Sequence, residues 1–203
     1  MSTQTVDYSE VSIWAMLRAS LGLSLIGFLL CGLLYSGVAT ALAQWLFPEQ
    51  ANGSLLYKNG QVVGSLLVAQ PVVQDKYFIG RPSAVNNDPV KMSGSNLAET
   101  NPELQQQIQQ RQQLIAKREQ VAISAIPADL LTSSGSGIDP DISVAGALIQ
   151  AKRIAQVRSL PESTVIHLIQ QHVQHKTWQV LGQAHVNVLQ LNLALDQLNA
   201  GHP

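Results

Sequence analysis

The sequence predicts an α+β fold with a single N-terminal transmembrane helix, followed by one domain that contains a β-hairpin, about three to four helices and a late strand. Residues 19–43 contain no Asp, Glu, Lys or Arg. An Asn59-Gly60 dipeptide lies between two apolar runs, and apolar residues recur at helical spacing farther along the chain. We therefore divide the 203 residues into a short tail (1–14), a membrane helix (15–46) and a domain (47–203).

The uncharged run is long enough to span a bilayer. At about 1.5 Å per residue a helix of this length extends for about 37 Å, against roughly 30 Å of hydrocarbon. A cleaved signal peptide has a shorter apolar core behind a basic segment, whereas the residues before this run carry two acids and only Arg18. A buried core helix is the other alternative. Trp14 and Trp45 lie where interfacial aromatic residues are expected, which favours an uncleaved membrane helix.

The basic residues give only a weak signal for orientation. Arg18 and the terminal amine lie on the N-terminal side of the uncharged run, whereas Lys58, Lys76 and Arg81 follow it. A short tail ahead of a large polar domain favours a cytoplasmic N-terminus and an extracytoplasmic domain. The single cysteine, Cys31, lies in the apolar run, so cysteine usage does not identify the compartment.

The first elements of the domain are indicated by local signals. Asn59-Gly60 tolerates the positive φ angles of a type I′ turn, so we expect a hairpin around it. Farther along, Asn101 can cap a helix, Pro102 suits its first position and Glu103 complements its dipole. These residues predict a helix from Pro102 to about Gln120.

Two arginines share the apolar face of this predicted helix. Leu104, Ile108 and Ile115 form the stripe, and Arg111 and Arg118 fall on it at helical spacing. Such arginines extend their charged ends to solvent, pair with carboxylates, or face a partner. Asp129 and Asp139 are the candidate carboxylates.

The stretch "TSSGSGIDPDIS", residues 132–143, combines a glycine-rich turn with a helix-start signal. Asp139 is a natural N-cap, Pro140 suits the first helical position, and Asp141 complements the first turn. Ala145 and Leu148 then belong to the predicted buried stripe, which also includes Ile142 and Ile149 and continues to Ile154.

The last third of the chain predicts another helix and a strand. Ser159 and Glu162 have the spacing of a capping box, with Val165 and Ile169 on the apolar face that follows. The alternation at Val186 and Val188 predicts a strand, and the leucines after it predict a short helix capped near Asn192.

Several kinds of chemistry lack their motifs. The sequence contains no "GxxxxGK[ST]" and no Asp-Lys-Thr-Gly, so we expect no ATP hydrolysis by this chain alone. Ser136 sits in "SGSG", which misses the nucleophile-elbow pattern because Ser134 replaces its first glycine. His172 and His175 are three residues apart, but a metal site needs further ligands. A net charge of −1 without a basic stripe argues against nucleic acid.

Four motifs together resemble one family. They are "YFIGRPSA" (77–84), "GSNLAETNP" (94–102), "SGSGIDPDIS" (134–143) and "VNVLQLNLAL" (186–195), in order behind one membrane helix. In this respect the chain resembles the C subunit of the Kdp high-affinity potassium-transporting P-type ATPase. Asp141 departs from the family pattern, which usually has His there.

The resemblance implies a non-catalytic accessory subunit in the bacterial inner membrane. Its implied partners are a potassium-channel-like subunit, a P-type pump subunit and membrane lipid. The complex handles ATP and potassium, with no cofactor bound by this chain alone, and the family has been viewed as a catalytic chaperone that raises the pump's ATP affinity. The motifs supply candidate docking or structural residues, beside the helix-face arginines Arg111 and Arg118: Gly135, Ser136, Gly137, Asp139, Pro140, Arg81, Asn96 and Asn187.

Two readings from other classes stay open at this point. One is a membrane-anchored extracytoplasmic serine hydrolase that uses Ser136, and the other is a stand-alone envelope binding module. Co-purification with two larger membrane subunits separates the accessory subunit from both.

Overall fold

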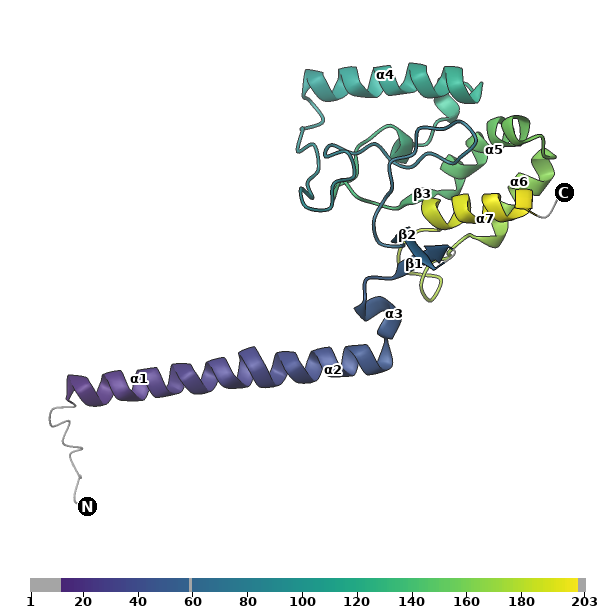
Figure 1. The fold of residues 1–203 in the computed structure, drawn as a ribbon. Helices are drawn as coiled ribbons and strands as arrows, with labels where there is room; N and C mark the ends of the chain where they lie inside the picture. The colour runs from purple at the N-terminus through teal and green to yellow at the C-terminus, as the bar shows by residue number, and fades with distance from the viewer. Residues whose placement is uncertain (1–11, 59, 201–203) are drawn as a thin grey trace. The chain divides into compact units, whose positions relative to one another are not determined.

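The computed structural model describes residues 12–58 and 60–200, in two compact units divided between Asn52 and Gly53. In the first unit, α1 (Ile13–Gly27), a π-helical stretch (Phe28–Tyr35) and α2 (Ser36–Leu46) form one continuous helix (Figure 1). This helix is long and apolar enough to cross a membrane, and no part of its apolar window is buried. One short helix, α3 (Pro48–Ala51), follows it. Most of the predicted tail lies outside the described residues.

The second unit begins with the predicted hairpin. Strands β1 (Leu55–Lys58) and β2 (Gln61–Ser65) pair antiparallel, with a register shift between Leu56 and Tyr57. Gly60 has a φ of 77°, in the left-handed region that a tight hairpin turn requires. Asn59 lies outside the described residues, but the strand pairing confirms the hairpin.

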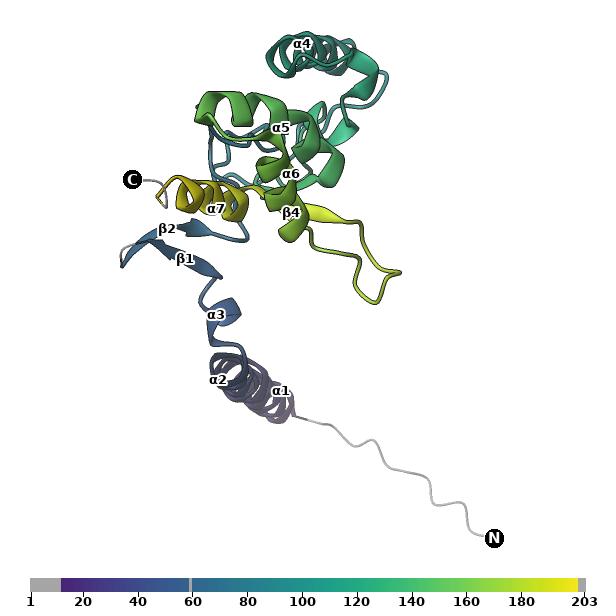
Figure 2. The same cartoon turned by 90° about the vertical axis from the view of Figure 1, so that its right-hand side faces the viewer.

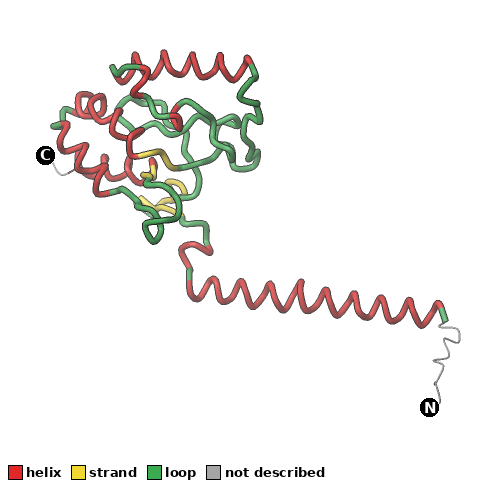
Figure 3. Tube along the Cα trace, turned by 180° about the vertical axis from the view of Figure 1, so that it is seen from behind, coloured by secondary structure: helices red, strands yellow, loops and turns green. Residues whose placement is uncertain are grey.

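Helix α4 (Pro102–Glu119) forms where its caps predict it. The Asn101 side chain accepts a hydrogen bond of 2.8 Å from the backbone N–H of Glu103, which satisfies one free donor of the first turn. Between β2 and α4 the chain follows a long connection, residues 66–101, that has no regular helix or strand (Figure 3). Backbone polar groups in such a connection need partners elsewhere in the domain.

The remaining elements alternate short strands with helices. Strand β3 (Asp141–Ser143) leads into α5 (Val144–Arg158) and then α6 (Glu162–Gln171); strand β4 (His185–Asn187) leads into α7 (Val188–Ala200) (Figures 1 and 2). The two strands pair antiparallel, with Ile142 opposite Val186. Together with the helices and the first hairpin, this confirms the predicted α+β class.

The predicted helix start at Asp139 and Pro140 is wrong by four residues. Residues 141–143 are extended because they pair with β4, and α5 begins only at Val144. Its cap is Ser143, whose hydroxyl accepts a hydrogen bond of 2.9 Å from the N–H of Gly146.

The buried face of α5 also differs from the prediction. Ala145 and Leu148 are exposed, and Ala147 and Ala151 are fully buried in their place. The burial predicted for Ile142 and Ile154 is confirmed. The core therefore receives mainly small side chains from this helix, which lets other elements approach it closely.

Two further cap predictions are corrected. Ser159 does not start α6: it ends α5 with a φ of 55°, and Pro161 precedes α6 without a side-chain cap bond. Helix α7 begins after Asn187, whose side-chain oxygen accepts from the N–H of Gln190 at 3.1 Å, so Asn192 is not its cap.

One hydrophobic core holds the domain together. It combines Phe78 of the long connection with residues of α5, α6, β4 and α7, and the predicted inward positions Val165 and Ile169 are confirmed. The members with no exposed surface are Phe78, Ala147, Ala151, Ile154, Val165, Ile169, Val186, Leu191 and Leu195.

Two buried amide side chains fasten the long connection to this core. Asn192 of α7 bonds both backbone groups of Phe78, accepting from N–H at 2.8 Å and donating to C=O at 2.9 Å. Gln150 of α5 does the same for Ile79, at 2.9 and 3.0 Å. The extended segment thus has its backbone paired as if by neighbouring strands.

Replacement of Asn192 by Leu should destabilise the domain strongly. The change leaves the buried N–H and C=O of Phe78 without partners, at a cost of about 1–3 kcal/mol for each unsatisfied group. Thermal and urea unfolding of the full chain in detergent measures the loss. Gln197→Leu is the matched control, because Gln197 is exposed on the same helix and should change stability little. Equal effects of the two variants would contradict the assigned role of Asn192.

Candidate docking site

The glycine-rich stretch is the place where two loops of the domain cross. The Ser134 hydroxyl accepts from the N–H of Gly137 at 2.7 Å, and the Ser83 hydroxyl donates to the Gly137 carbonyl at 2.7 Å. The N–H of Ser134 donates to the carbonyl of Pro82 at 3.1 Å. Gly135 and Ser136 remain exposed on the outer side of this crossing. The stretch therefore presents a rigid turn whose tip faces solvent.

Gly137 cannot be replaced by a larger residue without rearrangement. Its φ is 74°, and a Cβ placed on it would lie 2.5 Å from the Ser93 carbonyl oxygen and 2.5 Å from a Val85 methyl group. Gly135, two residues earlier, has open space around the same position. The two glycines of the motif thus have different roles, one in close packing and one at the surface.

The glycine-rich stretch is connected to strands β3 and β4 by contacts of Asp139, Pro140 and Asn187. Asp139 forms an ion pair of 2.7 Å with Arg81 and accepts from the N–H of Asp141 at 3.1 Å. The carbonyl of Pro140 accepts from the N–H of Val188 at 3.0 Å. Asn187 donates to the carbonyl of Leu66 at 2.9 Å and to the Asp141 carboxylate at 3.1 Å.

Asn96 lies farther along the connection. It has a φ of 54°, is exposed, and donates to the Ser93 hydroxyl at 3.3 Å. The segment that contains Asn96 packs against the glycine turn at Gly94. A Cβ added to Gly94 would lie 3.1 Å from the Gly135 carbonyl oxygen.

The geometry around Ser136 does not resemble a nucleophile elbow. Its hydroxyl accepts from the N–H of Ile138 at 3.2 Å and lies 3.5 Å from the Ser134 hydroxyl. Within the described residues no histidine ring makes a hydrogen bond to it, so no general base is in place. His172 and His175 belong to no cluster of three or more metal-ligating side chains in the described part of the chain.

The expected carboxylate partners of the helix-face arginines are wrong. Arg111 donates to the carbonyl of Leu131 at 2.8 Å, and Arg118 pairs with Glu119 at 2.6 Å. Asp139 is taken by Arg81, and Asp129 accepts from both the N–H and the hydroxyl of Ser143, at 2.7 and 3.0 Å. Burial lowers the pKa of Arg111.

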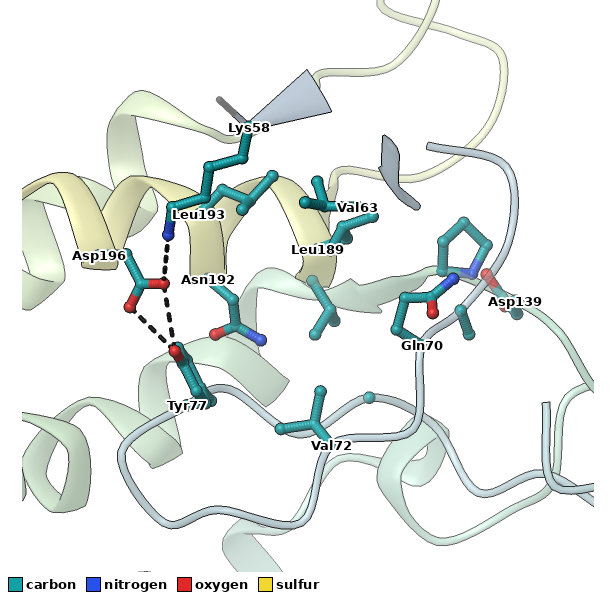
Figure 4. A pocket seen from close by; sticks show the side chains of 14 residues that line it. Lys58, Val63, Gln70, Val72, Tyr77, Asp139, Leu189, Asn192, Leu193 and Asp196 are labelled. Atoms are coloured by element: carbon teal, nitrogen blue, oxygen red, sulfur yellow. Dashed lines mark hydrogen bonds and ion pairs between the residues drawn. The ribbon is translucent and has the colours of Figure 1, made fainter. Parts of the chain in front are cut away.

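An apolar cavity of about 260 Å³ lies between the first hairpin and α7 (Figure 4). Val63, Val72, Leu189 and Leu193 line it, together with Pro140 of the glycine-rich stretch. None of these side chains offers a reactive group.

A polar cluster closes one end of this cavity. Asp196 accepts from Lys58 at 3.1 Å, from the Tyr77 hydroxyl at 3.0 Å and from Arg158 at 3.0 Å. The Arg158 guanidinium also lies 4.9 Å from the centre of the Tyr77 ring. The cluster therefore links the hairpin, the long connection, α5 and α7.

Two carboxylates respond to their surroundings in opposite directions. Burial tends to raise the pKa of Asp196, but its bonds from Arg158, Lys58 and Tyr77 outweigh burial and lower that pKa. Burial raises the pKa of Asp141, although His185, whose Nε2 lies 3.6 Å away, and Asn187 act against it.

Sequence reasoning missed the buried polar residues that fix the site. Gln150, Arg153 and Asn192 are nearly inaccessible; the first two lie outside the quoted motifs, and Asn192, within the motif of residues 186–195, was predicted only as a helix cap. A signal for them was present, because each interrupts a helical apolar face where a polar residue needs a buried partner.

An apolar helix long enough to cross a membrane, followed by an α+β domain with an exposed glycine turn, defines a class of proteins with one membrane-type helix and one folded domain. Residues 17–197 match the family described as "K+-transporting ATPase, c chain". The chain belongs to this family.

Relatives across several bacterial groups support the assignment. A protein of Shewanella putrefaciens, named "Potassium-transporting ATPase KdpC subunit", is 47% identical over 182 residues, which is 90% of this chain and 89% of the relative. Proteins of the same name are 48% identical in Xanthomonas campestris, over 92% of this chain and 89% of the relative, and 46% identical in Acidobacterium capsulatum, over 90% and 98%.

Gly137→Ala should destabilise the domain by about 1–3 kcal/mol, because it combines a left-handed backbone with a steric clash. Gly135→Ala, in open space, should leave stability within about 0.5 kcal/mol of wild type. Thermal unfolding of both full-length variants in the same detergent measures the difference. A Gly137→Ala protein as stable as Gly135→Ala would show that the crossing of the loops is not tightly packed.

Asp196→Asn should destabilise the domain at neutral pH and much less in acid. The folded-state pKa of Asp196 is lowered, so its ionised carboxylate stabilises the fold above its ordinary value of 3.8, and this stabilisation disappears as the pH falls through the lowered pKa. Unfolding midpoints of wild type and variant between pH 7 and about pH 3 should converge at low pH. Glu99→Gln, at an exposed residue that forms no ion pair with the described residues, should follow wild type throughout. A constant gap between Asp196→Asn and wild type would contradict this explanation.

Proposed function

We propose that this chain is a non-catalytic accessory subunit of an ATP-driven potassium-import complex, needed for assembly and stabilisation of the larger subunits. The observation that carries the proposal is the match of residues 17–197 to the K+-transporting ATPase c chain family. Relatives that align along about nine-tenths of this chain bear the name of a potassium-transporting ATPase subunit.

In this proposal the helix of residues 13–46 anchors the chain in the bacterial inner membrane. The N-terminus is cytoplasmic, and the domain from Gly53 onward is extracytoplasmic. The length and apolarity of the helix support the anchor. Arg18, at the N-terminal side of the apolar run, supports the orientation.

The proposed partners are a potassium-channel-like subunit and a P-type pump subunit, with lipid around the helix. ATP and potassium are handled by those subunits. The glycine turn supports a docking role, because Gly135 and Ser136 are exposed on a turn that Gly137 and Ser134 hold rigid. A preformed surface of this kind loses little conformational entropy on binding.

An influence on the pump's ATP affinity then acts through the complex. An extracytoplasmic domain does not contact cytoplasmic ATP, so the effect requires two states of the complex that this subunit contacts differently. In this proposal the catalytic-chaperone role is an allosteric one, in which contacts of this subunit with the complex change the ATP affinity of the pump subunit.

Expression of the two larger subunits with and without this chain tests the proposal. We expect both to co-purify with the chain, and potassium-dependent ATPase activity to fall strongly in its absence. Ser136→Ala should mainly weaken folding or assembly with the larger subunits, because the Ser136 hydroxyl belongs to the exposed turn and accepts from the N–H of Ile138. In sealed right-side-out spheroplasts, added protease should cleave the domain.

Three results would contradict parts of this proposal separately. Purification of the chain without larger partners would favour a stand-alone binding module. Loss of a hydrolase activity in Ser136→Ala, with assembly intact, would favour the hydrolase. A domain that resists protease in spheroplasts, but is cleaved after lysis, would place it in the cytoplasm.

A further inference from the structure

A second cavity, of about 340 Å³, lies between the long connection and α4. Its lining contains Arg81, Arg111 and Arg118 and no Asp or Glu. Two asparagines of the connection, Asn86 and Asn87, also line it. The helix-face arginines and the motif arginine, which are distant in sequence, therefore line one space whose remaining wall is mainly apolar.

The positive charge around this cavity exceeds the negative charge. A single carboxylate, Glu119, accepts from both Arg118 at 2.6 Å and Arg153 at 2.9 Å. Arg111 has no carboxylate within 4.0 Å among the described residues, and its bonds go to the Leu131 carbonyl and to neutral side chains. Two guanidinium groups, those of Arg118 and Arg153, thus share one carboxylate, and Arg111 has none among the described residues.

Arg81 adds an unsatisfied donor. One of its terminal nitrogens pairs with Asp139, but its Nε is buried and has no hydrogen-bond partner among the described residues. A buried donor of this kind ordinarily has an acceptor, and no described residue supplies one to this nitrogen. The side-chain amides of Asn86 and Asn87 make no hydrogen bond within the described part of the chain, which leaves further donors.

We propose that this cavity binds a tetrahedral oxyanion of the phosphate class, held principally by Arg111 and Arg81. Guanidinium groups bind phosphate oxygens through paired, charge-assisted hydrogen bonds. The anion supplies the negative charge that Arg111 lacks and an acceptor for the donors of Arg81 and the asparagines. Arg118 contributes positive charge from the next turns of α4. Free phosphate and the phosphate of an anionic lipid headgroup share this chemistry.

Titration of the full chain, purified in neutral detergent at low ionic strength, tests the proposal with inorganic phosphate. Calorimetry should detect binding, and Arg111→Gln should weaken it about tenfold or more, in keeping with the loss of hydrogen bonds to a charged group. Lys117→Gln removes the same charge from an exposed position of α4 outside the cavity, and should weaken binding no more than about twofold.

A lipid arm distinguishes the two sources of phosphate. The full chain is placed in nanodiscs of phosphatidylcholine alone or with phosphatidylglycerol, and its unfolding midpoint is measured. A gain in the anionic discs that Arg111→Gln abolishes and Lys117→Gln retains assigns the site to a lipid headgroup. Binding of inorganic phosphate without this gain assigns it to a free anion.

Either positive result requires that Arg111→Gln stays folded, which circular dichroism of the same samples verifies. Arg111→Lys retains the charge without the paired donors and should give intermediate affinity. Absence of binding from both sources, or equal binding by wild type and Arg111→Gln, overturns the proposal. In that case the positive charge of Arg111 would instead be compensated by an acidic group of a partner subunit.

Discussion

The domain depends on the pairing of one buried stretch of backbone, Phe78–Ile79. Its segment crosses the core without a neighbouring strand, so its N–H and C=O groups would be unsatisfied without Asn192 and Gln150. Each buried backbone group without a hydrogen-bond partner costs about 1–3 kcal/mol, which is a large fraction of the roughly 5–15 kcal/mol net stability of a domain. The long connection can therefore be irregular and still be fixed.

This pairing also decides how the candidate docking site is built. Once residues 78–79 are fixed, the chain continues directly to Arg81, Pro82 and Ser83, which contact the glycine-rich stretch. That stretch in turn ends in β3, which pairs with β4 at the start of α7. Helix α7 also carries Asn192, which binds the backbone of Phe78. The exposed turn at Gly135 is therefore held through contacts at both of its ends that lead back to the core.

The elements that could be predicted from sequence are those whose signals are local. The start of α4 needs only Asn101, Pro102 and Glu103, and the first hairpin needs only a turn between apolar runs. The start of α5 could not be predicted in the same way, because residues 141–143 are extended only through pairing with β4, far along the chain. Asn192 looked like a helix cap for the same reason: its partner, Phe78, is remote in sequence.

The counter-charges of Arg111 and Arg118 could not be predicted from local sequence either. Helical spacing placed Arg111 and Arg118 on one face of α4, but it could not identify their counter-charges. The fold assigns Asp139 to Arg81 and shares Glu119 between Arg118 and Arg153, which leaves Arg111 beside a cavity without a carboxylate. Arg111 is partly buried and has no carboxylate partner among the described residues, which distinguishes it from Arg81, Arg118 and Arg153. The docking turn and the cationic cavity are therefore separate features, one defined by exposed shape and the other by uncompensated charge.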